Sequence, residues 1–212
     1  MIQFSALDRV FSAFDNALKT LTTDPSGTGR PMPGQALPEA SLNDAQRSHA
    51  AGLMRVNHAG EVAAQGLYQG QALSTESPQQ ARALLEAARE ESDHLRWTRR
   101  RLTALDSRPS LFSPLWYAGA FCLGLVAGRL PAAQGMGFVS ETERQVEAHL
   151  KGHLSALPPE DARSRAVVTQ MMIDEAEHGA DARSMGGADL PRPVQLAMKA
   201  SAKLMIHTAY RL

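Results

Sequence analysis

The strongest constraint on this chain is a short motif, Glu-x-x-His, that occurs twice. The copies are Glu91–His94, in the run EESDHL, and Glu175–His178, in the run MMIDEAEHGADA. Residues three apart on an α-helix lie on one face, so each copy presents a carboxylate and an imidazole to the same side. One such motif is common on a solvated helix; its repetition makes the pattern informative.

A lone glutamate stands about 30 residues before each motif, the length needed for a helix, a turn and a return to the same depth. Four helices that turn these side chains inward supply four carboxylates and two imidazoles to one point. That is the ligand set of ferritin-like di-iron or di-manganese sites. The predicted metal ligands, which are also the predicted catalytic residues, are Glu61, Glu91, His94, Glu143, Glu175 and His178.

Two metal ions about 3.5–4 Å apart need bridging oxygen ligands. Because glutamate can switch between terminal and bridging modes, we expect Glu91 and Glu175 to bridge and the other four residues to bind terminally.

A metal-bound imidazole usually donates its second N–H to a carboxylate. Asp174 and Glu90 each precede a motif glutamate by one residue, so their side chains point about 100° round the helix, toward a neighbouring helix. We predict that Asp174 hydrogen-bonds His94 and that Glu90 hydrogen-bonds His178. The alternative is that both are ordinary solvated charges.

Three further side chains are candidates for the surroundings of the site. His58 is expected in an outer or surface position, because the ligand set is complete without it. His149 is expected to line the pocket or to hydrogen-bond locally. Tyr68 belongs either to the core or to the pocket wall.

Charge and cysteine content exclude several classes of protein. The chain has 22 basic and 22 acidic residues, which argues against a nucleic-acid binder that relies on phosphate neutralisation. The single cysteine, Cys122, cannot form an internal disulfide, and this fits a reducing cytoplasmic setting. The N-terminus carries Asp8 and no apolar core, unlike a secretory signal. Abundant helix formers without period-two alternation predict an all-helical protein.

The predicted fold is all-α: a ferritin-like four-helix bundle with an additional apolar interfacial helix between its two halves and flanking N- and C-terminal helices. Residues 1–40 form an N-terminal amphipathic helix, expected at 4–21, and a Pro/Gly-rich linker at 24–40, for which a tether is favoured over a mobile lid. Residues 41–212 form the ferritin-like di-iron domain. Its expected helices are 41–73, 78–105, 110–128, 138–156, 158–185 and 191–211, with Gly135-Met136-Gly137 loosening the chain before the fourth.

Residues 110–130 are the predicted membrane-interface segment. Positions 110–128 carry no charge, and about 18 apolar residues could cross a bilayer. Pro114 and several glycines and serines dilute this apolarity, so a buried or interfacial helix is favoured over a span. Trp116 and Tyr117 stand where interfacial anchors would be; the alternative is that they belong to the core.

The runs LMRVNHAGEVAAQGLYQGQA, EESDHL, VSETERQVEAHL and MMIDEAEHGADA closely resemble the demethoxyubiquinone hydroxylase family, over about residues 45–212. The resemblance implies a ferritin-like, membrane-associated di-iron monooxygenase of ubiquinone biosynthesis, a demethoxyubiquinol hydroxylase. Its ligands carry over to the six residues named above. The implied cofactors and co-substrates are two Fe ions per subunit, O2 and, as a candidate electron donor, NADH.

The resemblance also implies partners and a location. The partners are a polyprenyl benzoquinol substrate, the membrane surface and, as candidates, other ubiquinone-biosynthesis proteins, with no nucleic acid. The expected location is peripheral, at the cytoplasmic face of the cell membrane. From the residues alone, three other functions stay open: ferritin-like iron binding or ferroxidase activity, a di-manganese catalase, and a lipid-surface scaffold with a structural metal.

Overall fold

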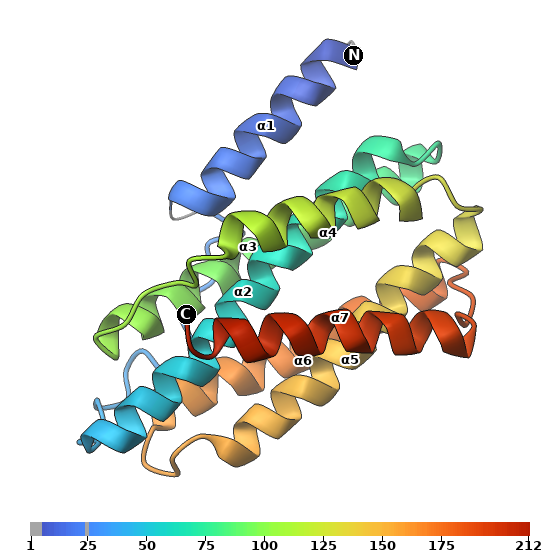
Figure 1. Cartoon of the computed structure of the whole chain (residues 1–212). Helices are drawn as coiled ribbons and strands as arrows, with labels where there is room; N and C mark the ends of the chain where they lie inside the picture. Colours follow the sequence, from blue (N-terminus) through green and yellow to red (C-terminus); the bar gives the residue numbers. More distant parts are fainter. Residues whose placement is uncertain (1–5, 24–25) are drawn as a thin grey trace.

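The computed structural model describes residues 6–23 and 26–212, and within these ranges every regular element is an α-helix (Figure 1). The elements are α1 (Ala6–Thr22), α2 (Asp44–Ser74), α3 (Pro78–Ala104), α4 (Ser113–Ala127), α5 (Ala132–Ala156), α6 (Ala162–Ser184) and α7 (Arg192–Ala209). The all-α prediction is confirmed. The first two residues of the helix expected at 4–21 lie outside the described residues.

Helices α2, α3, α5 and α6 form the ferritin-like bundle, and α2 is its central element, since α1, α3, α4, α5 and α7 all contact it. Helices α5 and α6 pack against each other, and α3 contacts α6. Helix α4 lies along the outside of α2, and α7 lies across α2 and α5 (Figure 1). The C-terminal half of α1 packs on this assembly, while its N-terminal half extends away from it.

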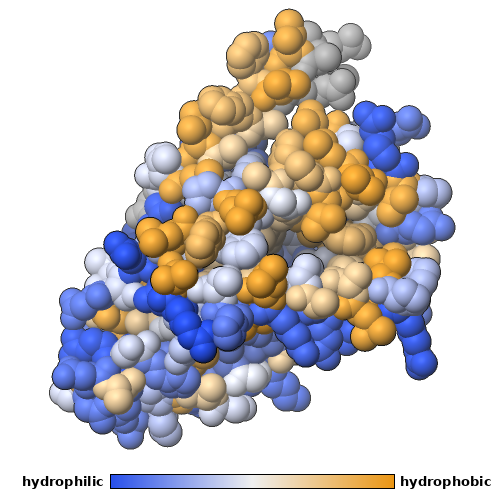
Figure 2. All heavy atoms as spheres, in the orientation of Figure 1, coloured by the Kyte–Doolittle hydropathy of each residue, from blue (hydrophilic) through white to orange (hydrophobic). Residues whose placement is uncertain are grey.

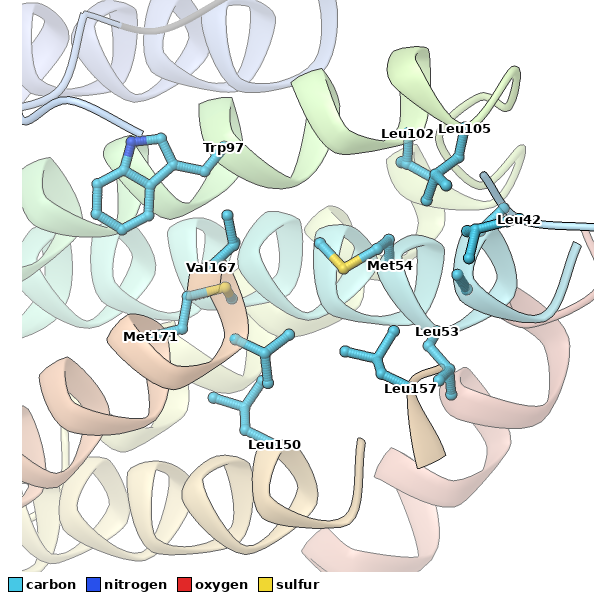
Figure 3. Close-up of a cluster of buried hydrophobic side chains, with 13 residues drawn as sticks. Leu42, Leu53, Met54, Trp97, Leu102, Leu105, Leu150, Leu157, Val167 and Met171 are labelled. Atoms are coloured by element: carbon cyan, nitrogen blue, oxygen red, sulfur yellow. The ribbon is translucent and has the colours of Figure 1, made fainter. Parts of the chain in front are cut away.

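Two apolar clusters fill the bundle and leave a polar layer between them. The larger takes side chains from all four bundle helices (Figure 3), among them Met54, Trp97, Leu150 and Met171. The smaller takes Tyr68, Leu84, Val139 and Ala182 from the same four helices. On each helix the predicted ligands fall between these two positions. Because each buried Leu, Met or Val contributes about 1.5–3 kcal/mol, we expect the apolar clusters to hold the bundle together.

Capping residues set the starts of α2 and α3. The Asn43 side chain accepts from the backbone N–H of Gln46 at 2.9 Å, and the Gln46 side chain accepts from the Asn43 N–H at 3.0 Å. This is a capping box, which satisfies two N–H groups that the helix leaves free. Ser77 caps α3 by accepting from the N–H of Gln80 at 3.3 Å, and Pro78 follows at the first helical position.

Helix α5 begins at Ala132, and Gly135-Met136-Gly137 lie inside it. The prediction that these residues loosen the chain before a helix at 138 is wrong. A Cβ on Gly137 would lie 2.0 Å from the backbone oxygen of Ala188. Glycine costs about 0.5–1 kcal/mol inside a helix, and here it allows close contact with a neighbouring backbone.

Helix α6 begins at Ala162, about one turn later than the start expected at Pro158-Pro159. The prolines belong to a turn, which the Asp161 N–H closes by donating to the carbonyl of Pro158 at 3.1 Å. The N-cap is Asp161, whose side chain accepts from the N–H of Ser164 at 3.1 Å. A carboxylate at this position satisfies a free N–H at the helix start.

Residues 26–40 are not a simple tether, contrary to the expectation for the Pro/Gly-rich linker. They lie against α3 and α6 and are held there by arginines of both helices. Arg101 of α3 contacts Glu39 at 2.6 Å, and Arg163 of α6 contacts the same carboxylate at 2.9 Å. Arg163 also donates to the carbonyl of Leu37 at 2.6 Å. The segment is therefore part of the folded domain.

Helices α2 and α4 pack backbone against backbone. A Cβ on Gly70 of α2 would lie 2.2 Å from the carbonyl oxygen of Phe121, and a Cβ on Gly124 of α4 would lie 2.2 Å from that of Leu67. Only glycine permits such an approach, as in membrane helix pairs that use small residues at their contacts. One face of α4 is thereby committed to the bundle.

The aromatic pair at the start of α4 packs inward. Tyr117 is buried and donates from its hydroxyl to Gln69 Oε1 at 2.5 Å. Trp116 is partly buried against Val56 and Ala209. Both therefore contribute to packing, and the proposed role as interfacial anchors has no support at these two positions.

The outer face of α4 exposes large apolar side chains. Leu115, Leu123 and Val126 are 59 %, 52 % and 64 % exposed. Helix α1 exposes a second apolar row that includes Phe11 and Phe14. Figure 2 shows hydrophobic residues gathered over both helices. Among the described helices, none combines the length and apolarity needed to cross a bilayer.

Buried His58 makes stability depend on pH. Neither ring nitrogen has a hydrogen-bond partner within the described part of the chain. Burial, and then the charge of Arg99, lower the pKa of His58 to about 3. The unfolded chain takes up this proton near pH 6.5, because its imidazole is not buried. The contribution of neutral His58 to the free energy of unfolding is therefore fully present above pH 6.5. As the pH falls toward 3, this contribution decreases by about 1.4 kcal/mol per pH unit.

We therefore expect His58→Leu to lose this part of the pH dependence. Chemical unfolding of the wild-type and variant proteins between pH 7.5 and pH 5 gives, for each, the slope of the free energy of unfolding against pH. The other histidines contribute equally to both slopes, so the difference between the slopes is the contribution of His58. Identical slopes would contradict the assignment.

Candidate metal centre

The six predicted ligands meet in the polar layer between the two apolar clusters. Helix α2 supplies Glu61, α3 supplies the first motif, α5 supplies Glu143, and α6 supplies the second motif. All six side chains are buried, with residue exposures from 0 % to 8 %. Buried carboxylates are usually paired with a positive charge or bound to a metal. The four buried glutamates of this layer therefore need such a partner.

Four of the six place ligand atoms around one point. One ligand atom from each of Glu61, Glu91, His94 and Glu175 lies within 4.8 Å of all the others. His94 Nδ1 is 2.8 Å from Glu91 Oε2 and 3.7 Å from Glu61 Oε2. Atoms of these types at such distances can move onto a single metal ion with small side-chain adjustments.

Glu91 and Glu175 also reach the second histidine. Glu91 Oε1 lies 2.9 Å from His178 Nδ1, while its other oxygen contacts His94. Glu175 divides in the same way, with Oε1 3.6 Å from His94 Nδ1 and Oε2 3.8 Å from His178 Nδ1. Each of these two carboxylates therefore spans the gap between the imidazoles, as a bridging ligand must.

Glu143 closes the layer on the side of α5, where the Tyr68 hydroxyl donates a hydrogen bond to its Oε1. Tyr68 is fully buried, so it is at once core and site wall, and its hydroxyl fixes the orientation of the carboxylate. The sequence left this contact open, because Tyr68 lies two helical turns from Glu61 and belongs to no motif.

Both outer hydrogen bonds predicted for Asp174 and Glu90 are confirmed. His94 Nε2 donates to Asp174 Oδ2 at 2.7 Å, and His178 Nε2 donates to Glu90 Oε2 at 2.9 Å. Each imidazole is thus held from the opposite half of the chain, with its Nδ1 turned toward the layer. This arrangement fixes the ring and leaves one nitrogen for a metal.

The carboxylates of the layer divide into two kinds. Desolvation and then the charge of Glu91 raise the pKa of Glu61 well above its ordinary value. Desolvation and then the charge of Glu175 do the same to Glu143. For Glu91, desolvation is outweighed by the two neighbouring imidazoles, which lower its pKa. Glu91, one of the two carboxylates that span both histidines, therefore keeps its charge.

The imidazoles carry the compensating charge. Desolvation alone would lower the pKa of His94, but Glu91 and Asp174 outweigh it and raise that pKa well above the ordinary value. The neighbouring carboxylates of Glu175 and Glu91 likewise outweigh desolvation and raise the pKa of His178 to about 12. A metal ion entering the layer must displace these protons, so binding should release protons to solvent.

The residues present fit a metal pair. Glu91 Oε1, Glu175 Oε2 and His178 Nδ1 are buried; they face one another as ion pairs at 2.9 and 3.8 Å, without the geometry of a hydrogen bond. A buried polar atom without a hydrogen bond typically costs about 1–3 kcal/mol, and all three atoms belong to predicted ligands. Carboxylate oxygens with imidazole nitrogens and no thiolate suit iron or manganese. The layer has the donor set of a metal-binding site.

The other candidate histidines lie outside this layer. His58 is buried near Arg99 and, although it lies one turn before Glu61, forms no hydrogen bond with any of the six ligands. His149 is partly buried and packs on His153, with ring centres 3.9 Å apart. This is a ring contact: the buried Nε2 of His149 has no hydrogen-bond partner among the described residues, so the expected local hydrogen bond is not found.

A four-helix bundle with two Glu-x-x-His motifs around one buried carboxylate–imidazole layer defines a ferritin-like metal protein. Comparison with known families is consistent with this class and narrows it: residues 48–209 match the family described as "Ubiquinone biosynthesis protein COQ7". The chain belongs to that family.

Individual relatives cover nearly the whole chain. A protein of Janthinobacterium sp. (strain Marseille) is 56 % identical over 205 residues, 97 % of this chain and 98 % of its own length. One of Nitrosospira multiformis is 54 % identical over 204 residues, 96 % and 98 % of the two lengths. One of Burkholderia cenocepacia (strain HI2424) is 54 % identical over 207 residues, 97 % and 99 %. All three are named 3-demethoxyubiquinol 3-hydroxylase, and the family resemblance drawn from the motifs is confirmed.

Proposed function

We propose that this chain is a 3-demethoxyubiquinol 3-hydroxylase, a monooxygenase that hydroxylates the ring of a polyprenylated demethoxyubiquinol in ubiquinone biosynthesis. The observation that carries the proposal is the double span of Glu91 and Glu175 between His94 and His178. It occurs in a chain that is 54 % identical to a protein of that name over nearly its full length.

In the proposed reaction one oxygen atom of O2 enters a ring C–H bond and the other leaves as water. Two electrons and a proton come from a reductant such as NADH, which is oxidised to NAD+, and a further proton comes from solvent. Two iron ions bound by the six ligands would supply the reductive activation of O2.

The chain's own residues prepare the layer for this chemistry. Glu91 and Glu175, which each reach both imidazoles, would contribute to holding both ions, and the other four ligands would each hold one. Tyr68 orients Glu143 through its hydroxyl. Burial of the layer excludes bulk water from the reacting groups, which strengthens every electrostatic interaction inside it and limits side reactions.

We further propose that the chain attaches peripherally to a membrane, at the cytoplasmic face of the cell membrane. The exposed apolar faces of α1 and α4 support this (Figure 2). A polyprenyl tail is practically insoluble in water, so an enzyme acting on such a quinol gains from resting on the bilayer that contains it. Other proteins of ubiquinone biosynthesis are candidate partners at the same surface.

Purified chain reconstituted with Fe(II), a short-tailed demethoxyubiquinol, NADH and 18O2 tests the activity. We expect a hydroxylated quinol that carries one 18O atom, formed only when protein, iron and reductant are all present. Disproportionation of peroxide without quinol hydroxylation would point instead to a catalase. Continued iron uptake beyond a pair of ions per chain, again without product, would point to a storage protein.

A further inference from the structure

The segment 26–30, which we call the strap, lies against α3 beside the first motif. The backbone N–H groups of Thr28 and Gly29 donate to the two oxygens of buried Asp93, at 3.2 and 3.3 Å. Gly27 has a φ of +54°, and a Cβ there would lie 2.4 Å from Asp93 Oδ1. Arg96 holds the strap from outside by donating to the carbonyl of Arg30 at 2.8 Å. The strap is thus fixed at one position along α3.

This docking places Arg30 at the metal layer. Its Nη2 forms an ion pair with Asp174 Oδ2 at 2.9 Å, and its guanidinium stacks over the indole of Trp97 at 5.1 Å from the ring centre. The same oxygen, Asp174 Oδ2, accepts the hydrogen bond from His94 Nε2 at 2.7 Å. A contiguous chain of contacts therefore runs from Arg30 through Asp174 to His94.

The second histidine has no equivalent support. Its outer partner, Glu90, has a side chain that is 45 % exposed, against 5 % for Asp174. Within the described residues no arginine or lysine forms an ion pair with Glu90, whose side chain contacts His178 at 2.9 Å. The two halves of the layer share the same ligand types but differ in how firmly the imidazole is held.

We propose that Arg30 is a positioning residue of the metal centre, which fixes Asp174 and thereby the ring of His94, so that the metal position at His94 binds more tightly than the one at His178. The inference rests on the proposed function only in that the six ligands must hold two ions. Outer partners of metal-bound histidines typically change metal affinity by about 10–100-fold. The Arg30 side chain is 34 % exposed, but it pairs with a buried carboxylate, so its contact with Asp174 belongs to the same class.

Metal titration of the apo full-length chain with Co(II), followed by visible absorption, tests the proposal without turnover. We expect wild-type protein to bind two equivalents in separate steps. Arg30→Gln should weaken the first step about tenfold and leave the second unchanged, and Arg30→Lys, which keeps the charge, should recover part of the loss. Glu90→Gln should weaken the second step only.

The matched control is Arg163→Gln, which removes contacts to residues 37 and 39 without touching the strap or Asp174. It should keep the wild-type first step. If wild-type protein binds two equivalents of Co(II) and the titration of Arg30→Gln is identical to that of wild type, the inference is overturned. The proposed function is not affected by that result. An equal loss in both steps together with a lowered melting temperature would also overturn it, since it indicates a structural role. No Co(II) binding by wild-type protein would defeat the inference and the proposed metal centre together.

Discussion

Glu91→Ala and Glu175→Ala should each lose most of the bound iron and more than about 100-fold in hydroxylation, beyond the roughly 10–100-fold loss typical of an outer partner. Each of these carboxylates contacts both imidazoles, with one oxygen toward each. Removing either one therefore affects both metal positions. Iron content by elemental analysis and product formation by mass spectrometry measure the two effects.

The fold should survive these changes, because the apolar clusters on either side of the layer are untouched. Circular dichroism melts check this. Matched controls are Glu86→Ala on α3 and Glu177→Ala on α6, which remove exposed glutamates from the same helices. Both should keep iron and activity. Normal iron occupancy in Glu91→Ala or Glu175→Ala would show that the ligand assignment is wrong.

Three aspartates on the outer face of α4, at Leu115, Leu123 and Val126, should move the protein from the membrane fraction to the soluble fraction. Burying an apolar side chain of this size is worth about 1.5–3 kcal/mol, so opposing three of them should lower the bound fraction at least tenfold. The changes should leave the fold intact, because all three side chains are more than half exposed. Flotation with lipid vesicles, together with a thermal melt, measures both properties.

The control for this surface replaces exposed apolar residues elsewhere, Leu85 of α3 and Ile173 of α6, with aspartate. This double variant should stay with the vesicles. Unchanged vesicle binding by a folded α4 variant would count against the proposed interface.

The metal layer could be predicted from the sequence because helix geometry converts spacing directly into position. Two Glu-x-x-His motifs and two glutamates at matched distances define one depth in a bundle. The same geometry predicted that Asp174 and Glu90 accept hydrogen bonds from the two motif histidines, because each residue along an α-helix is rotated by about 100° from the one before it.

Features that depend on packing between distant segments were not predictable in the same way. Gly137 reads as a helix breaker in the sequence, whereas its contact with the backbone of Ala188 explains its place inside α5. Arg30 lies in a Pro/Gly-rich run that composition describes as a linker. Its position follows from Asp93, a residue inside the first motif whose carboxylate accepts hydrogen bonds from the strap. Trp116 and Tyr117 gave no sign of which side of α4 they would occupy.

Diffraction from crystals of the iron-loaded protein, recorded at the iron absorption edge, tests the central claim most directly. The account predicts two anomalous peaks about 3.5–4 Å apart, both between Glu91 and Glu175, one beside His94 and the other beside His178. A single peak, or peaks away from these side chains in protein that retains its activity, would contradict it.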